Sequence, residues 1–143
     1  MSAMLYYEDV HIGDELPTLT KHPTTQQLVK YAGASGDFYQ IHYDKDFALG
    51  LGLPGVILHG LLKAAFLGQL LTDWIGVEGF IKEFDCSYRG MDVPGQPLYC
   101  KGRVTNKFEE GNEHCIECDI WTENPGGEHT TPGKAVVVLP RRS

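Results

Sequence analysis

The sequence predicts an α+β fold in which one long helix packs against a curved antiparallel β-sheet. The longest helical candidate, residues 58–74, is apolar on nearly every side of the helical wheel, which is typical of a helix enclosed by other structure. Four strand-like segments separated by Gly, Pro and Asn turns follow it. Helices that precede a run of antiparallel strands usually cover one face of the sheet. Because no repeat or linker interrupts the chain, we expect residues 1–143 to form a single domain.

The segment before the long helix contains weaker signals. A short edge element is expected over residues 10–16. Thr24 and Gln27 have the spacing of a capping box, so a short helix is predicted over residues 26–32. Gly33 is the expected end of that helix, and a loop rich in glycine and proline then leads to the long helix.

The second half of the chain is predicted to form the sheet. The expected strands cover residues 80–89, 98–108, 114–123 and 133–139. Apolar and polar residues alternate weakly over residues 115–122, as in a strand with one wetter face. Residues 136–139 are all apolar, so this strand is expected to be covered on both sides.

The composition excludes several classes of partner. The net charge of -7 and the pI of about 5.2 argue against nucleic acid or an anionic membrane as a main partner. The apolar run over residues 53–75 contains proline, histidine, lysine and aspartate, so it predicts a buried helix rather than a membrane span. Neither a secretory signal nor a transit peptide is recognisable at the start, and we expect a cytoplasmic protein.

The four cysteines are expected to be free thiols. Cys115 and Cys118 have CxxC spacing, but they fall in a predicted strand, where side chains three residues apart face opposite sides of the sheet. No second cysteine pair or nearby histidine pair completes a zinc site. We therefore expect no metal and no cofactor.

The stretch SGDFYQIH places Asp37 and His42 five residues apart behind a glycine. That spacing separates two side chains by about 140° on a helix and puts them on opposite faces of a strand. Only a loop can aim both at one point, and Gly33 and Gly36 provide backbone freedom for it. Two interpretations remain open: a turn in which Asp37 accepts backbone hydrogen bonds, or an acid–base pair.

A second candidate element, His59-Gly60, lies at the start of the long helix. A helix N-terminus presents unpaired N–H groups and favours developing negative charge, such as a thioester carbonyl that becomes an enolate. Gly60 is explained equally well by close approach of a ligand and by close packing of helix on sheet. His59 is more simply a packed or capping side chain than a ligand contact.

Together these residues resemble the MaoC-like dehydratase family, which includes the (R)-specific enoyl-CoA hydratases. The family pattern has an aromatic residue, small residues, Gly-Asp-x-Asn-Pro-aliphatic-His, and then Ala or Ser after five residues. The matching residues, at the same spacing, are Tyr31, Ser35, Gly36, Asp37, Ile41, His42 and Ala48. His59-Gly60 matches the family's later His-Gly, and residues 92–98 are similar to its PVxxGDxL turn. The resemblance covers roughly residues 7–140.

The resemblance implies a hotdog fold, a long helix wrapped by an antiparallel sheet, that forms a homodimer or higher homo-oligomer. It implies that Asp37 and His42 activate one water, which adds to C3 of a trans-2-enoyl-CoA thioester while a proton is delivered to C2. The backbone N–H of Gly60 would hold the thioester oxygen. The implied substrate is an enoyl-CoA, or the (R)-3-hydroxyacyl-CoA in the reverse direction.

Three departures from the family pattern concern the substrate. Tyr39-Gln40 replaces Asn-Pro, so Tyr39 either replaces a hydrogen bond or reshapes the pocket. Gly68 stands where some relatives have a serine, which removes a polar contact and adds room, and Gln96 replaces an aspartate. We take Tyr39, His59 and Gly68 as candidate substrate-binding residues. Weaker candidates are Phe66, Leu70, Trp74 and Phe84 for the acyl pocket, and Arg89, Lys101 and Arg103 for the CoA phosphates.

The sequence leaves three functions to compare. The first is a hydro-lyase that uses the Asp37/His42 dyad. The second is a hotdog acyl-CoA thioesterase, which also needs an acid and a held thioester carbonyl. The third is a non-catalytic acyl-CoA-binding subunit of a hetero-oligomer, motivated by the Tyr39-Gln40 replacement.

Overall fold

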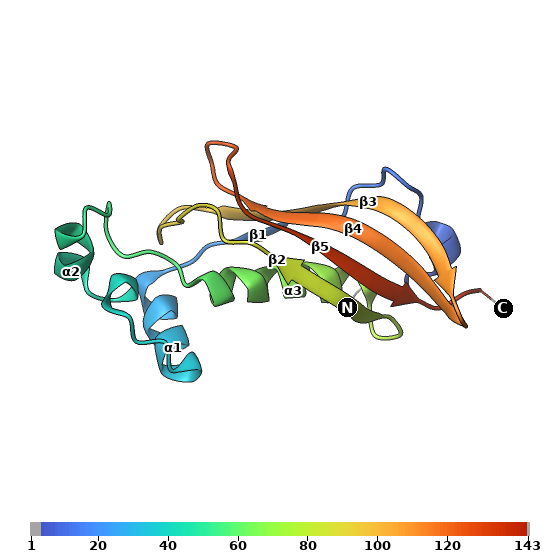
Figure 1. Cartoon of the computed structure of the whole chain (residues 1–143), viewed down its shortest axis with the longest axis horizontal. Coiled ribbons are helices and arrows are strands. Elements are labelled where there is room, and N and C mark those ends of the chain that lie inside the picture. The colour runs from blue at the N-terminus through green and yellow to red at the C-terminus, as the bar shows by residue number, and fades with distance from the viewer. Residues whose placement is uncertain (1–3, 143) are drawn as a thin grey trace.

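A five-stranded antiparallel sheet curls along helix α3 (Gly60–Ile75) in the computed structural model, which describes residues 4–142 (Figure 1). The strand order is β1-β3-β4-β5-β2. The strands are β1 (Leu19–Lys21), β2 (Phe80–Cys86), β3 (Leu98–Glu110), β4 (Glu113–Glu123) and β5 (His129–Leu139). The predicted α+β class is confirmed, with the helix on one face of an antiparallel sheet as in a hotdog fold.

Helix α3 supplies most of the helical half of the core. Its buried apolar residues lie on the side that faces the sheet; they are Leu62, Phe66, Leu67, Leu70, Leu71 and Ile75. The expectation of a helix covered on all sides is wrong for the single chain. Leu61, Ala65 and Thr72 are exposed, because one sheet can cover only one side of a cylinder.

Helix α1 (Thr25–Ser35) is longer than predicted. Thr24 caps it as expected, since its Oγ1 accepts a hydrogen bond from the Gln27 N–H at 3.1 Å. The helix passes through Gly33 and ends at Gly36, whose φ of 79° is in the left-handed region that glycine adopts freely. The predicted end at Gly33 is therefore wrong, and the chain leaves the helix one residue before Asp37.

The expected glycine-rich loop contains a helix that the sequence did not reveal. After the single turn η2 (Gln40–His42), α2 (Lys45–Gly50) is capped by Asp44, whose Oδ1 accepts a hydrogen bond from the Phe47 N–H at 3.1 Å. Near the N-terminus, the chain forms the single turn η1 (Tyr7–Asp9). The edge element expected over residues 10–16 is present as a short irregular pairing: residues 13–16 hydrogen-bond to β3 around a bridge between Glu15 and Arg103. β1 pairs with the start of β3 along the same edge.

The last strands differ from prediction mainly at their ends. β5 begins at His129, opposite Glu123, because β4 pairs with its first residues. On the other side, the carbonyls of Thr130 and Pro132 accept hydrogen bonds from the N–H groups of Ser87, Arg89 and Gly90, an irregular segment that follows β2. Residues 136–139 are buried, as predicted. Cys118 belongs to the main core and Cys115 to a separate small cluster, so their side chains face opposite sides of the sheet, as expected.

The search for a membrane-spanning helix covers the same described residues. None of the helices within residues 4–142 combines the length and the apolar character that a bilayer crossing needs.

Candidate active site

The loop after α1 brings Asp37 and His42 together. Because α1 ends at Gly36, Asp37 already lies outside the helix, and its N–H donates to Ser35 Oγ at 3.2 Å. The η2 turn then redirects the chain and carries His42 inward. His42 Nε2 lies 3.8 Å from Asp37 Oδ2. The sequence identified the two residues and the need for a loop, while their chemical roles stay a prediction.

Hydrogen bonding determines the tautomer of His42. Its Nδ1 is 2.8 Å from the Ile57 carbonyl oxygen, which can only accept, so Nδ1 carries the proton. In the neutral ring, Nε2 then presents a lone pair toward the Asp37 carboxylate. Two acceptors that face each other across 3.8 Å are satisfied by a molecule with two donor hydrogens, such as one water. His42 is buried, whereas the Asp37 side chain is 42% exposed.

His59 lies behind the dyad and is fully buried. Its ring stacks on His42 with centroids 3.8 Å apart, and its Nε2 donates to the backbone carbonyl of Asp37 at 3.3 Å. Burial is the main cause that lowers the pKa of His59, and a proton on the adjacent His42 ring would lower it further, so the His59 ring is neutral near pH 7. This placement favours the packing interpretation over direct contact with substrate.

Asp37, His42 and His59 also offer three metal-ligating atoms within 4.8 Å of one another. The histidine rings are nearly parallel, with an interplanar angle of 19°, so their in-plane lone pairs do not converge on one point. His42 Nδ1 and His59 Nε2 already bond to carbonyls, which leaves His42 Nε2 and the buried, unpartnered His59 Nδ1 as free nitrogens on two stacked rings. The arrangement is therefore poorly suited to the converging ligands of a metal site.

Gly60 is the first residue of α3, where backbone N–H groups lack partners inside the helix. An added Cβ at Gly60 would lie 3.0 Å from the Tyr88 ring. The Tyr88 ring itself is half exposed. Close packing therefore explains why residue 60 has no side chain, and Tyr88 is a neighbour of the site that the sequence did not indicate.

A buried ion pair fixes the start of α3. Lys63 Nζ donates to Asp92 Oδ2 at 3.0 Å and to the Gly90 carbonyl at 2.9 Å, and the two charged side chains are only 3% and 6% exposed. The backbone carbonyl of Asp92 accepts the Leu58 N–H at 2.9 Å. Residues 90–92 thus bind the chain on both sides of Gly60. The only sequence signal was a lysine within the apolar run of the long helix.

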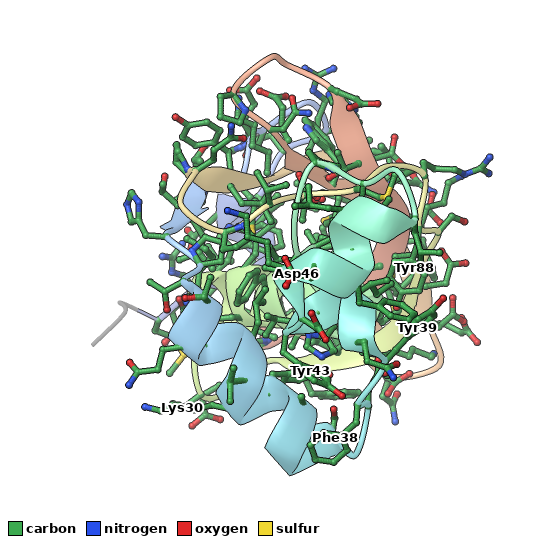
Figure 2. All side chains as sticks on the ribbon, turned by 90° about the vertical axis from the view of Figure 1, so that its left-hand side faces the viewer. Lys30, Phe38, Tyr39, Tyr43, Asp46 and Tyr88 are labelled. Carbon is green, nitrogen blue, oxygen red and sulfur yellow. The ribbon has the colours of Figure 1, made fainter. Side chains whose placement is uncertain are left out.

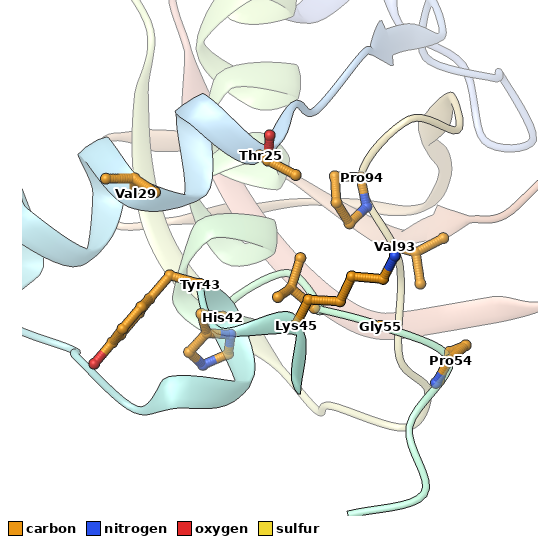
Figure 3. Close-up of a pocket in the computed structure, with 10 residues that line it drawn as sticks. Thr25, Val29, His42, Tyr43, Lys45, Pro54, Gly55, Val93 and Pro94 are labelled. Carbon is orange, nitrogen blue, oxygen red and sulfur yellow. The ribbon is translucent and has the colours of Figure 1, made fainter. Parts of the chain in front are cut away.

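Two cavities meet at His42. The first, which we call the Gly60 cavity, has a volume of about 360 Å³; Gly60, Lys63, Tyr88 and Arg89 contribute to its wall. The second, which we call the Lys45 cavity, has a volume of about 390 Å³ (Figure 3). Its wall consists of Thr25, Val29, His42, Tyr43, Lys45, Pro54, Gly55, Val56, Val93 and Pro94.

The two remaining candidate substrate residues lie in different places. Tyr39 is half exposed at the edge of the dyad, with its ring centroid 6.4 Å from that of His42. Figure 2 shows Tyr39, Tyr43 and Tyr88 at the same end of the molecule. Gly68 has open space around it, since an added Cβ would meet no atom within 4 Å. It lines neither cavity at His42, so the single chain does not bring it to the dyad.

The weaker candidates for the acyl pocket and for the CoA phosphates also lie in different parts of the molecule. Phe66 and Leu70 are core residues that face the sheet. Arg89 lines the Gly60 cavity together with His42. Lys101 on β3 instead pairs with Glu123 at 2.9 Å, and the exposed Arg103 of β3 lies 3.6 Å from Glu15. Trp74 is half-buried against the core, and Phe84 is partly exposed on β2.

Comparisons with known proteins agree with this architecture. A family model described as "MaoC like domain" matches residues 9–122. The chain is 28% identical over 122 residues to the 3-oxo-4,17-pregnadiene-20-carboxyl-CoA hydratase beta subunit of Mycobacterium tuberculosis, covering 84% of this chain and 90% of that protein. It is 28% identical over 123 residues to the (R)-specific enoyl-CoA hydratase of Aeromonas caviae, covering 85% and 90%. A 73-residue stretch is 40% identical to fatty acid synthase beta subunit TOXC of Cochliobolus carbonum, 50% of this chain but only 4% of that protein.

Solved structures show the same fold. The (R)-hydratase of A. caviae superposes with a TM-score of 0.85 at 24% identity, covering 93% of this chain and 99% of that chain. One chain of the ChsH1-ChsH2 complex of M. tuberculosis gives a TM-score of 0.79 at 22% identity, covering 90% of this chain and 98% of that chain. With the family model matched over residues 9–122, these findings establish that the chain belongs to the MaoC-like domain family and has its hotdog fold.

Proposed function

We propose that this protein is a hydro-lyase that adds water to an enoyl-CoA thioester, or removes it from the 3-hydroxyacyl-CoA. One observation carries the proposal: the lone pair of His42 Nε2 faces the Asp37 carboxylate across 3.8 Å. One water beside the pair can donate a hydrogen bond to each group at this separation. Its oxygen keeps a lone pair for attack on carbon.

In the proposed reaction, the water oxygen bonds to C3 of the conjugated thioester. The water O–H bond breaks, and its proton passes to the Asp37/His42 pair. The electron pair of the C2–C3 double bond moves toward the thioester oxygen, and the resulting enolate takes one proton at C2 from the pair. The Gly60 N–H, at the positive end of α3, stabilises the enolate oxygen, since donors aimed at a developing oxyanion typically contribute about 10²–10³-fold to rate.

The comparisons support this class of reaction without deciding the substrate. Two relatives that match most of their length are named hydratases of CoA thioesters. We propose a homodimer or a higher homo-oligomer. A heteromer, with this chain as an acyl-CoA-binding subunit, is the second candidate, because one relative is named a beta subunit and one similar structure is a complex of two proteins.

Loss of enoyl absorbance tests the proposal. The substrates are crotonyl-CoA and a panel of longer, branched and cyclic enoyl-CoA esters, with His42→Ala as the control variant. Hydration should remove the absorbance without release of free CoA, which a thiol reagent would detect if the protein were a thioesterase. Burial raises the pKa of Cys100 and Cys118 to about 12, so these thiols contribute little background to that reagent. Turnover of no ester by the wild-type protein would contradict the proposal.

A further inference from the structure

His42 forms part of the wall of two cavities, the Gly60 cavity and the Lys45 cavity. An acyl-CoA thioester has two arms on either side of its reacting carbonyl: the acyl chain and the pantetheine arm that ends in anionic phosphates. If the carbonyl is held at Gly60 and C3 lies near His42, as proposed above, the two arms need two exits. The inference that follows rests on that proposed function.

The Gly60 cavity has little charge to offer a phosphate. Its buried cation, Lys63, is already neutralised by Asp92 at 3.0 Å. Tyr88 and Met91 add apolar surface to the wall. Arg89 is the remaining cation there, and within residues 4–142 it takes part in none of the ion pairs. Arg89 also lines an outer groove whose wall includes Asp85, Asp119, Arg103 and Lys134. Apart from Arg89, the wall of the Gly60 cavity suits an apolar group.

The Lys45 cavity combines a mainly apolar wall with a single lysine. As in the Gly60 cavity, no Asp or Glu contributes to the wall. In Figure 3 the Lys45 side chain runs from beside His42 toward Val93 and Pro94. Within residues 4–142, Lys45 takes part in none of the ion pairs.

The acid that precedes Lys45 is engaged elsewhere. Asp44 Oδ1 accepts the Phe47 N–H at 3.1 Å and so caps α2. Lys45 is exposed, and its ammonium is a point charge on a flexible stem with three donors. An unpaired cation beside an apolar cavity, in a chain of net charge -7, is suited to an anionic group attached to an apolar arm.

We propose that the Lys45 cavity holds the pantetheine arm of the CoA thioester and that Lys45 binds a CoA phosphate. The apolar wall contacts the arm, and His42 marks the end at which the thioester lies. Lys45 is thus a substrate-binding residue that contacts the CoA part of the thioester and not its acyl group. Among the cations considered at this end of the molecule, this assignment prefers Lys45 to Arg89.

The test compares two esters that differ only in the phosphate-bearing part: crotonyl-CoA and crotonyl-pantetheine. Lys45→Gln should raise KM for crotonyl-CoA roughly 10-fold, because a charge-assisted hydrogen bond is lost, with kcat unchanged. KM for crotonyl-pantetheine should stay within about twofold, since that ester has no charge for Lys45 to bind. Added salt should weaken wild-type binding of the CoA ester more than that of the variant.

Two matched variants complete the design. Lys30→Gln removes an exposed lysine of α1 and should change neither KM (Figure 2). Arg89→Gln removes the cation of the other cavity. The proposal is overturned if Lys45→Gln affects both esters equally or neither, or if Arg89→Gln alone produces the CoA-selective effect.

The proposal for Lys45 can also be tested if the protein turns out to have no hydratase activity. In that case neither ester is turned over by the wild-type protein, and binding of free CoA and of pantetheine is measured by calorimetry. Lys45→Gln should then weaken CoA binding roughly 10-fold and leave pantetheine binding unchanged. Equal CoA affinity in the wild-type protein and the variant would overturn the proposal independently of catalysis.

Discussion

The first prediction concerns the contribution of the buried Lys63–Asp92 ion pair, which holds the start of α3, to the free energy of unfolding. Lys63→Met keeps the length and apolar stem of the side chain but removes the ammonium. Asp92, 6% exposed, would then carry a buried carboxylate without its cation. Removing one partner of a buried ion pair typically costs about 3–5 kcal/mol. For a chain of 143 residues this corresponds to a decrease in Tm of roughly 10–15 °C.

Thermal and urea unfolding, followed by circular dichroism at pH 7, measures the effect. The double variant Lys63→Met/Asp92→Leu should recover most of the lost free energy of unfolding, because it leaves no unpaired charge. Lys30→Met, at an exposed lysine, should stay within about 0.5 kcal/mol of the wild-type protein. The reasoning is refuted if Lys63→Met loses less than about 1 kcal/mol, or if the double variant is no more stable than the single one.

Two other predictions concern the groups around the dyad. Gly60→Ala places a methyl 3.0 Å from the Tyr88 ring and should lower kcat/KM for crotonyl-CoA by about 10-fold or more through displacement of the helix start; unchanged kinetics would show that the ring yields freely. Because the pKa of His59 is lowered in the folded state, the unfolded chain binds a proton that the folded one does not as pH falls below 6.5. The free energy of unfolding should therefore be level above neutral pH and decrease below pH 6.5, by at most about 1.4 kcal/mol per pH unit from this group. His59→Phe should remove that part of the slope in urea titrations, and an identical slope in the variant would exclude His59 as its origin.

The sequence predicted the layers of the fold because their signals are local and periodic. The apolar wheel of α3 and the turns between the strands are visible without tertiary contacts. It failed where two local signals competed. Glycine weakens helices, so the pattern predicts that α1 ends at Gly33, yet Gly36, three residues later, adopts the left-handed conformation that ends the helix.

The candidate site was predictable only in part. The spacing of Asp37 and His42 shows that only a loop can bring them together, but it leaves the turn and the acid–base interpretations open. The dyad role comes from the resemblance to the MaoC-like family and stays a prediction. The Tyr88 ring and the Lys63–Asp92 pair were missed, since their partners lie 28 and 29 residues away along the chain. Such contacts depend on how the segment after β2 passes the start of α3, which no local pattern encodes. The single-domain boundary and the cytoplasmic location stay predictions.

The ratio of kcat/KM between the wild-type protein and Asp37→Asn, with crotonyl-CoA as substrate, tests the central claim most directly. Asparagine preserves the size of the side chain, and the Asp37 backbone carbonyl that His59 binds is retained. It removes the charge and places a donor or a weaker acceptor opposite His42. If Asp37 and His42 activate one water, the variant should lose roughly 10²–10⁴-fold in kcat/KM while its unfolding curve is unchanged. A variant that hydrates crotonyl-CoA at the wild-type rate would contradict the account.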